Sequence, residues 1–169
     1  MTIILDKNQL QLTIQRLSHQ LMEAHPDFTD VAFIGIQTGG IYLADKIVEF
    51  LREINTSKKI NYGKLDITFY RDDIRKEVLV PNQTDINFSI ENKKVVLIDD
   101  VLYTGRTIRA ALDALQSFGR PEKVELLVLI DRKLSRQLPI QPDYFGKAID
   151  NIISGTVKVK WDTEEVILF

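Results

Sequence analysis

Three short runs of almost uninterrupted apolar residues constrain the fold most strongly: residues 31–36 (Val-Ala-Phe-Ile-Gly-Ile), 94–98 and 124–130. Runs of this length and composition are typical of strands that are buried on both faces of a parallel sheet. The segments after the first two runs, about residues 44–51 and 108–115, repeat apolar residues at helical spacing. Because strands alternate with helices, the sequence predicts an α/β fold with a mostly parallel central sheet flanked by helices.

The rest of the chain completes this outline. A first helix is expected to begin at Asp6, a suitable N-cap, and to end before His25-Pro26-Asp27. Residues 65–70 alternate apolar and polar side chains for most of their length and predict another strand, and residues 157–161 and 166–169 predict late strands. We expect one domain, residues 1–169, with a small C-terminal hood at about residues 138–169.

Composition excludes several classes of protein. The chain has no cysteine, which excludes disulfide frameworks, thiolate zinc sites and cysteine nucleophiles. Its net charge of -2 argues against a generally basic nucleic-acid binder, although a local basic face is compatible with that value. The sequence shows neither a signal-peptide pattern nor an apolar stretch long enough to span a membrane, so we expect a cytoplasmic protein.

The turn after the second apolar run is the strongest candidate for chemistry. Asp99 and Asp100 end this run, where carboxylates are costly unless they have a partner or a task. Thr104-Gly105-Arg106-Thr107 then opens a helix, and Gly105 permits a tight turn whose N–H groups suit a phosphate. Carboxylates suit sugar hydroxyls or a hydrated magnesium ion. The segment therefore fits a ligand with a ribose diol and a 5-phosphate, and the alternative is a capped turn without a ligand.

Residues 95–107 closely resemble the phosphoribosyl-pyrophosphate signature of type I phosphoribosyltransferases: an apolar strand, two acids, a short spacer and Thr-Gly-basic-Thr. The resemblance implies that Asp99 and Asp100 hold the ribose 2- and 3-hydroxyls and bind Mg²⁺, directly or through water. It further implies an enzyme that uses 5-phosphoribosyl-1-pyrophosphate with Mg²⁺. The residues that it assigns to the 5-phosphate loop are Tyr103, Thr104, Gly105, Arg106 and Thr107.

A second turn, Gln37-Thr38-Gly39-Gly40, joins the first apolar run to its helix. Taken alone, a Thr-Gly-Gly turn is as compatible with a simple connection as with a binding site. The resembled family places its pyrophosphate loop here, and backbone N–H groups at a helix start would face a leaving group that gains negative charge. We therefore expect residues 37–40 to form the pyrophosphate loop.

A long polar loop at about residues 71–87 is the third candidate element. A loop of that length is uncommon in a compact domain unless it is a lid or a binding loop. In the resembled family a flexible loop in this region closes over the reaction, as lids do in other enzymes. The resemblance favours Arg71 as a pyrophosphate ligand, with Arg75 and Lys76 as alternatives, while a solvated charge run is the structural alternative.

The resemblance extends over nearly the whole chain to one subgroup, the pyrimidine operon attenuation regulators with uracil phosphoribosyltransferase activity. It rests on residues 40–44, 65–73, 100–107 and 138–147. Purine-type members usually have an acid immediately before the Thr-Gly pair, where it meets N7 of the base, whereas this chain has Tyr103. Uracil, UMP and UTP are therefore the implied ligands. A purine-type transferase, and a regulator that uses its site only as a nucleotide sensor, remain open.

The same resemblance suggests two further groups of residues. Tyr144 and Asp162 are candidates for the base hood, although an aromatic residue near the end of a small domain is more often part of the core. The subgroup binds pyrimidine leader mRNA and usually forms dimers or tetramers. Candidate RNA contacts are Arg16, His19 and Arg132, for which solvated surface charge is an equal alternative. Gln37, Gly39 and Gln141 replace residues that are usually basic in the subgroup, which counts against RNA binding.

Overall fold

The computed structural model describes residues 1–72, 83–150 and 155–169. The strands in these ranges are β1 (Thr2–Leu5), β2 (Val31–Ile36), β3 (Asn61–Leu65), β4 (Lys94–Leu102), β5 (Lys123–Arg132), β6 (Tyr144–Ile149), β7 (Val157–Lys160) and β8 (Glu165–Leu168). The α-helices are α1 (Lys7–Ala24), α2 (Gly39–Ile54) and α3 (Arg106–Leu115). No helix among the described residues is long and apolar enough to cross a membrane.

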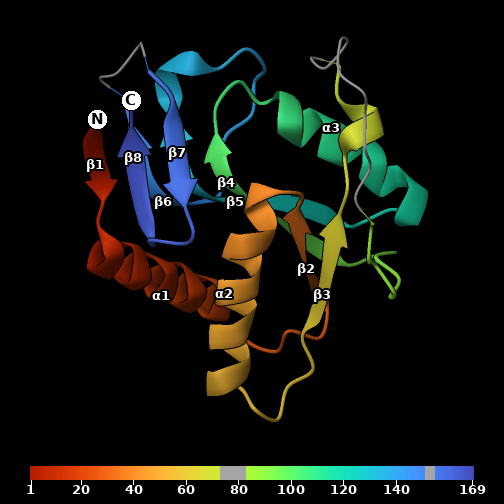
Figure 1. Cartoon of the computed structure of the whole chain (residues 1–169). Helices are drawn as coiled ribbons and strands as arrows, with labels where there is room; N and C mark the ends of the chain where they lie inside the picture. Colours follow the sequence, from red (N-terminus) through yellow and green to blue (C-terminus); the bar gives the residue numbers. More distant parts are fainter. Residues whose placement is uncertain (73–82, 151–154) are drawn as a thin grey trace.

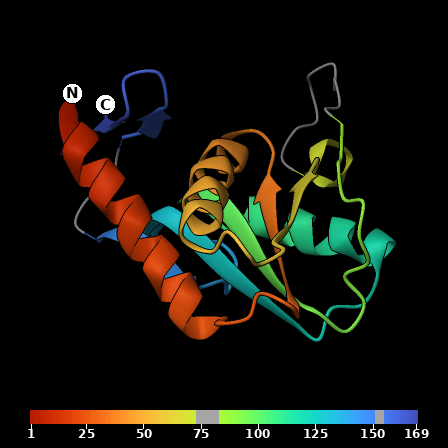
Figure 2. The same ribbon diagram turned by 90° about the horizontal axis from the view of Figure 1, so that it is seen from below.

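A parallel sheet in the order β3-β2-β4-β5-β6 forms the centre of the molecule. Helices α1 and α2 cover one face of this sheet and α3 covers the other, as the two views in Figures 1 and 2 show. This arrangement confirms the predicted α/β fold. Parallel strands must be joined by crossovers, and α2 and α3 supply the crossovers from β2 to β3 and from β4 to β5.

The apolar runs exist because the central strands are buried on both faces. In β4, Val96 and Ile98 pack into the core beneath α1 and α2, whereas Val95 and Leu97 pack into the core beneath α3. Successive side chains of a strand point to opposite faces, so a strand between two helical layers needs apolar residues at every position. The predictions of strands at residues 31–36, 94–98 and 124–130 are confirmed.

The start of α1 also follows the prediction. The side chain of Asp6 accepts a hydrogen bond from the backbone N–H of Gln9 at 2.9 Å, and Gln9 Oε1 accepts one from the N–H of Asp6 at 3.1 Å. This reciprocal pair is a capping box, which satisfies two backbone donors at the helix start. The helix ends at Ala24, directly before His25.

A second sheet, antiparallel in the order β1-β8-β7, lies beside the central sheet at the ends of the chain (Figure 1). Glu164, in the turn between β7 and β8, fixes it to the helices. Its carboxylate pairs with Lys46 of α2 at 2.7 Å and with Lys7 of α1 at 3.0 Å. Hydrogen bonds from Lys46 and Lys7 lower the pKa of Glu164 to about 2. These ion pairs attach the C-terminal hairpin to both helices.

Two segments differ from the prediction. The prediction of a strand at residues 65–70 is wrong, because β3 ends at Leu65 and residues 68–70 form a 3-10 helix. Asp66 explains the change, since its carboxylate accepts a hydrogen bond from the N–H of Thr68 at 3.0 Å and turns the chain. Strands β1 and β6 are additional. Strand β6 is the edge of the central sheet and contains Gly146, so its sequence lacks the apolar run of the inner strands.

A buried polar cluster lies toward the amino end of β5. Glu125 Oε2 lies 2.9 Å from His25 Nε2 and accepts a hydrogen bond from the Tyr144 hydroxyl at 2.9 Å. Glu125 Oε1 accepts one from Lys123 at 2.9 Å. Burial alone would raise the pKa of Glu125, but the hydrogen bonds from Lys123, His25 and Tyr144 outweigh it, and the pKa is lowered. This cluster ties the end of α1 to β5 and β6.

We predict that Glu125→Ala lowers the free energy of unfolding by about 3 kcal/mol at neutral pH, because it leaves buried donors without an acceptor. Because the folded pKa of Glu125 lies below its unfolded value, its contribution is present above the ordinary carboxyl pKa and is lost as the pH falls through the folded value. Urea unfolding at several pH values measures both effects. Exposed Glu122→Ala is the control, and equal stabilities of the two variants would contradict the prediction.

Candidate functional site

The carboxyl end of β4 carries two carboxylates in a buried position. Asp99 is 6% exposed, and its Oδ1 accepts a hydrogen bond from the N–H of Asp100 at 3.0 Å. The carboxylate of Asp100 accepts one from the N–H of Val101 at 2.8 Å. Burial raises the pKa of both carboxyl groups, and the neighbouring charge of Asp100 raises that of Asp99 further. A ligand that brings hydroxyl donors or a cation would stabilise the charged forms.

The glycine pair at the start of α2 packs directly on this acid pair. A methyl group on Gly39 would collide with the carboxylate of Asp100. One on Gly40 would collide with the carbonyl of Ile98 and would lie 2.9 Å from the Cα of Asp99. Two turns that are 60 residues apart in the sequence are therefore in contact, which is possible only because both glycines lack a side chain.

The residues before these glycines hold the turn in place. The N–H of Gln37 donates to the carbonyl of Leu65 at 2.9 Å, and its Nε2 donates to the carbonyl of Gln83 at 2.8 Å. The peptide bond between Gln37 and Thr38 is cis. The side chain of Thr38 is exposed and does not cap α2 through a hydrogen bond. The predicted pyrophosphate loop thus lies between the acid pair and the end of the polar loop.

The segment 103–107 forms a concave turn at the start of α3. Gly105 has a φ of 94°, in the left-handed region that favours glycine. A cavity of about 300 Å³ opens here, and Arg71, Asp99 and Thr104 to Thr107 are among its lining residues. The charge of Arg71 lowers the pKa of Asp99, against the larger effect of burial. The structure thus brings Arg71, Asp99 and the predicted phosphate loop together around one cavity.

A strap formed by residues 136–140 braces this loop, a contact that was not predicted from the sequence. The N–H groups of Gln137 and Leu138 donate to the carbonyl of Thr104 at 2.9 Å and 3.1 Å. Arg136 donates to the carbonyl of Tyr103 at 2.8 Å and pairs with buried Asp131 at 2.5 Å. These bonds fix the backbone of the loop.

Asp72, at the start of the polar loop, forms ion pairs that were not predicted from the sequence. Its carboxylate pairs with Arg106 at 2.9 Å and with Arg109 at 3.0 Å. These contacts join the start of the polar loop to the first turns of α3. Residues 73–82, which include most of the predicted lid with Arg75 and Lys76, lie outside the described residues.

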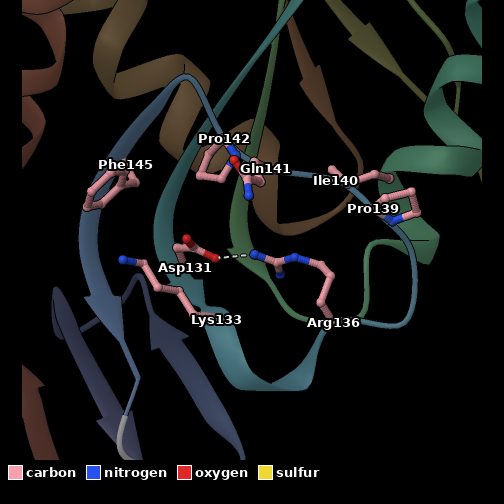
Figure 3. A pocket seen from close by; sticks show the side chains of 8 residues that line it. All are labelled: Asp131, Lys133, Arg136, Pro139, Ile140, Gln141, Pro142 and Phe145. Atoms are coloured by element: carbon pink, nitrogen blue, oxygen red, sulfur yellow. Dashed lines mark hydrogen bonds and ion pairs between the residues drawn. The ribbon is translucent and has the colours of Figure 1, made fainter.

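A second cavity, of about 500 Å³, lies beyond the strap and is drawn in Figure 3. The ion pair of Asp131 and Arg136 crosses its floor, and Lys133 and Phe145 lie together on one side. The Nζ of Lys133 lies 5.9 Å from the centroid of the Phe145 ring. The cavity therefore combines an exposed aromatic ring with a cation.

The remaining predicted residues lie apart from the acid pair. Tyr144, expected in the base hood, lies near the amino end of β5 and donates to Glu125, so the structure does not bring it to the site. Asp162 is exposed, and its neighbour Trp161 stacks on Tyr42 of α2 with 6.0 Å between ring centroids. The hood turn that contains Asp162 thus lies beside the first turn of α2.

The three candidate RNA residues differ in exposure. Arg16 is exposed, yet its Nη2 donates to the carbonyls of Phe145 at 3.2 Å and of Gly146 at 2.6 Å. His19 is exposed and packs edge-on against Phe50. Arg132 is only 4% exposed and is therefore poorly placed for contact with a macromolecule.

Comparison with known proteins decides the family. A phosphoribosyl transferase domain model matches residues 1–164 of the chain. The chain belongs to the phosphoribosyltransferase family. The bifunctional protein PyrR of Elusimicrobium minutum is 44% identical over 170 residues, which cover 98% of this chain and 94% of that protein. The bifunctional protein PyrR of a Picosynechococcus species is 47% identical over 157 residues, which cover 92% and 88%.

Solved structures agree on the phosphoribosyltransferase fold. A hypoxanthine phosphoribosyltransferase from Staphylococcus aureus matches with a TM-score of 0.69 at 22% identity and covers 89% of this chain and 78% of its own. The Trypanosoma cruzi hypoxanthine phosphoribosyltransferase, in complex with the product IMP, matches with a TM-score of 0.73 at 14% identity and covers 98% and 92%. At these identities the likeness establishes the fold alone.

Gly39→Ala should abolish the contact between the two turns of this phosphoribosyltransferase. The added methyl group would displace the Asp100 carboxylate, so we expect kcat/KM for phosphoribosyl transfer to fall by about 100-fold, as it does when a positioned group is misplaced by about 1 Å. Steady-state kinetics measures this effect. Glu49→Ala, an exposed change on the same helix, is the control, and wild-type kinetics for Gly39→Ala would contradict the predicted contact.

Asp99→Asn should separate stability from activity. The folded chain keeps a proton on Asp99 to higher pH than the unfolded chain, so ionisation of Asp99 lowers stability as the pH rises above the ordinary carboxyl pKa. We expect the variant to be more stable than wild type by about 1 kcal/mol near pH 8, with a smaller gain near pH 4. Turnover should fall by about 100-fold or more.

Thermal unfolding across this pH range and an activity assay test the two expectations separately. A variant of unchanged stability would contradict the argument from burial. A variant with wild-type turnover would remove Asp99 from the site.

Proposed function

We propose that the chain is a uracil phosphoribosyltransferase that forms UMP and pyrophosphate from uracil and 5-phosphoribosyl-1-pyrophosphate. The contact between the Asp99–Asp100 pair and the glycine turn at residues 37–40 carries the proposal. It puts carboxylates suited to ribose hydroxyls beside backbone donors suited to a pyrophosphate. Tyr103 supports a pyrimidine, because purine-type members of the resembled family usually have an acid at this position.

The residues around the cavity suit each part of the phosphoribosyl donor. Thr104 to Thr107 would hold the 5-phosphate at the start of α3, where N–H groups and the helix dipole favour an anion. The acid pair would orient the ribose through its two hydroxyls. The turn at residues 37–40 and Arg71 would hold the pyrophosphate as its bond to C1 breaks. Catalysis then rests on positioning and electrostatics, without a covalent nucleophile.

The acid pair also fits a magnesium ion bound with the substrate. Among the described residues there is no group of three or more His, Cys, Asp or Glu side chains that could hold a metal ion by itself. Magnesium usually takes one or two protein carboxylates and completes its shell with phosphate oxygens and water. Asp99 and Asp100 would supply the protein ligands, directly or through water, and the ion would neutralise the charge of the pyrophosphate.

We predict that the wild-type chain, incubated with phosphoribosyl pyrophosphate and Mg²⁺, forms UMP from uracil and forms no nucleotide from hypoxanthine, guanine or orotate. Chromatography of each reaction measures the product. Asp99→Asn is the matched inactive control. A purine nucleotide would overturn the argument from Tyr103. UMP binding without any product would indicate that the site serves as a nucleotide sensor.

We propose RNA-dependent regulation as a second function, which the regulators that the sequence resembles combine with uracil transfer. The name of the relatives, bifunctional protein PyrR, is compatible with two functions. Arg16, Lys133 and Phe145 form an exposed surface, in which Arg16 contacts the backbone of Phe145 and Lys133 lies over its ring. Cations on such a surface neutralise RNA phosphates, and an exposed aromatic ring stacks on an unpaired base.

A pyrimidine leader hairpin should bind this surface with an affinity that falls with added salt and rises with UMP. Replacing Lys133 by Gln and Phe145 by Ala together should weaken binding by about 10-fold, because one base stack and one phosphate contact are lost. Filter binding at several salt concentrations measures this. Lys158→Gln, an exposed lysine on β7, is the control. No binding at low salt would remove the RNA function and leave the transferase proposal intact.

A further inference from the structure

Arg132, the last residue of β5, is a buried cation beside the transferase cavity. Its side chain is 4% exposed, and its guanidinium lies over the ring of Tyr103, with 4.5 Å between Cζ and the ring centroid. Tyr103 is the first residue of the predicted 5-phosphate loop and lines the same cavity as Asp99. The stack therefore holds the guanidinium against a residue that lines the cavity.

Most hydrogen-bonding capacity of Arg132 is unused within the described part of the chain. Its Nη1 donates to the carbonyl of Gly155 at 2.9 Å. Its Nε and Nη2 are buried and have no hydrogen-bond partner among the residues that the structure describes. The nearby carboxylate of Asp131 pairs with Arg136 instead. A buried guanidinium with unsatisfied donors is unfavourable unless an acceptor arrives with a ligand.

The other unsatisfied donor of this region points to the same kind of ligand. Among the described residues, buried side-chain polar atoms without a partner occur only on Arg132 and Trp161, and all of them are N–H donors. Trp161 belongs to the hood, beside the first turn of α2. A ligand that binds beneath the hood is therefore expected to present acceptors. Uracil presents two carbonyl oxygens, O2 and O4.

We infer that Arg132 binds a carbonyl oxygen of uracil through Nε and Nη2 and stabilises the negative charge that gathers there during transfer. This inference rests on the proposed function and assigns a catalytic and specificity-determining residue to it. As the N1–C1 bond forms, the C1–O bond to pyrophosphate breaks and its electron pair leaves with the pyrophosphate. The N1 proton passes to solvent. Until the bond is complete, the charge of the deprotonated base is spread over N1, O2 and O4.

Charge on the base makes a specific test possible. A guanidinium that stabilises the deprotonated base has its largest effect on a base whose N1 proton is weakly acidic. In 5-fluorouracil the fluorine withdraws electrons and makes the N1 proton more acidic, so this base depends less on Arg132. A residue that only supports the fold would affect both bases equally.

The experiment compares wild type with Arg132→Met and Arg132→Lys in steady-state assays with uracil and with 5-fluorouracil. For Arg132→Met we expect kcat/KM for uracil to fall by about 100-fold, as after loss of one charge-stabilising donor. The KM for phosphoribosyl pyrophosphate should stay within about twofold of the wild-type value. The fall in kcat/KM for 5-fluorouracil should be about tenfold smaller than the fall for uracil. Arg132→Lys keeps the positive charge but not the paired N–H donors of the guanidinium, so its fall in kcat/KM for uracil should be intermediate.

Thermal unfolding shows whether each variant is folded. If Arg132→Met does not fold, kcat/KM for uracil and for 5-fluorouracil is compared in Arg132→Lys instead. Exposed Arg120→Gln is the control and should behave as wild type. Equal losses with both bases, a loss confined to the KM for phosphoribosyl pyrophosphate, or no loss would each overturn the inference. If wild type forms no UMP, the proposed function fails; if wild type forms UMP and the Arg132 variants match it, only this inference fails.

Discussion

Gly39 and Gly40, at the start of α2, pack against Asp100 and the backbone of β4 so closely that a methyl group on either would collide. This contact joins two strand-to-helix turns that are 60 residues apart in the sequence. It also limits how the central strands can be arranged, because β2 and β4 must be neighbours for their carboxyl ends to meet. The parallel sheet, covered by helices on both faces, supplies a rigid base for that meeting.

The acid pair illustrates how such a site is maintained. Asp99 is buried in an environment that raises its pKa, a condition that destabilises the free chain at neutral pH. The surrounding sheet is apolar on both faces, and the strap from Arg136 to Ile140 holds the adjacent loop by its backbone. The stable core therefore compensates for local electrostatic destabilisation, as functional sites in enzymes often require.

Local sequence patterns predicted the three inner strands of the central sheet, the capping of α1 by Asp6 and the turn at residues 99–107, because each depends on residues that are close in the chain. The strand expected at residues 65–70 failed because one side chain, Asp66, forms a local turn that alternation does not reveal. The pairs of Arg136 with Asp131 and of Asp72 with Arg106 were missed. In these pairs, tertiary structure selects one partner among many charged residues, and nothing in the spacing identifies it.

Arg132 shows the same limit for function. In the sequence it is one basic residue among several and was assigned with Arg16 to an RNA surface. The structure buries it over Tyr103, whereas Arg16 stays exposed. The sequence therefore shows that both residues are cations, but it does not show which of them is buried and which is exposed to solvent.

The hydrogen bonds of Arg16 to the carbonyls of Phe145 and Gly146 have a consequence for solubility. Strand β6 is an outer strand of the central sheet, and the unpaired backbone groups of such a strand can recruit a strand from another molecule. By donating to carbonyl oxygens of β6 from α1, Arg16 leaves this border less able to continue the sheet. A basic residue on the first helix thus discourages the chains from joining edge to edge at high concentration.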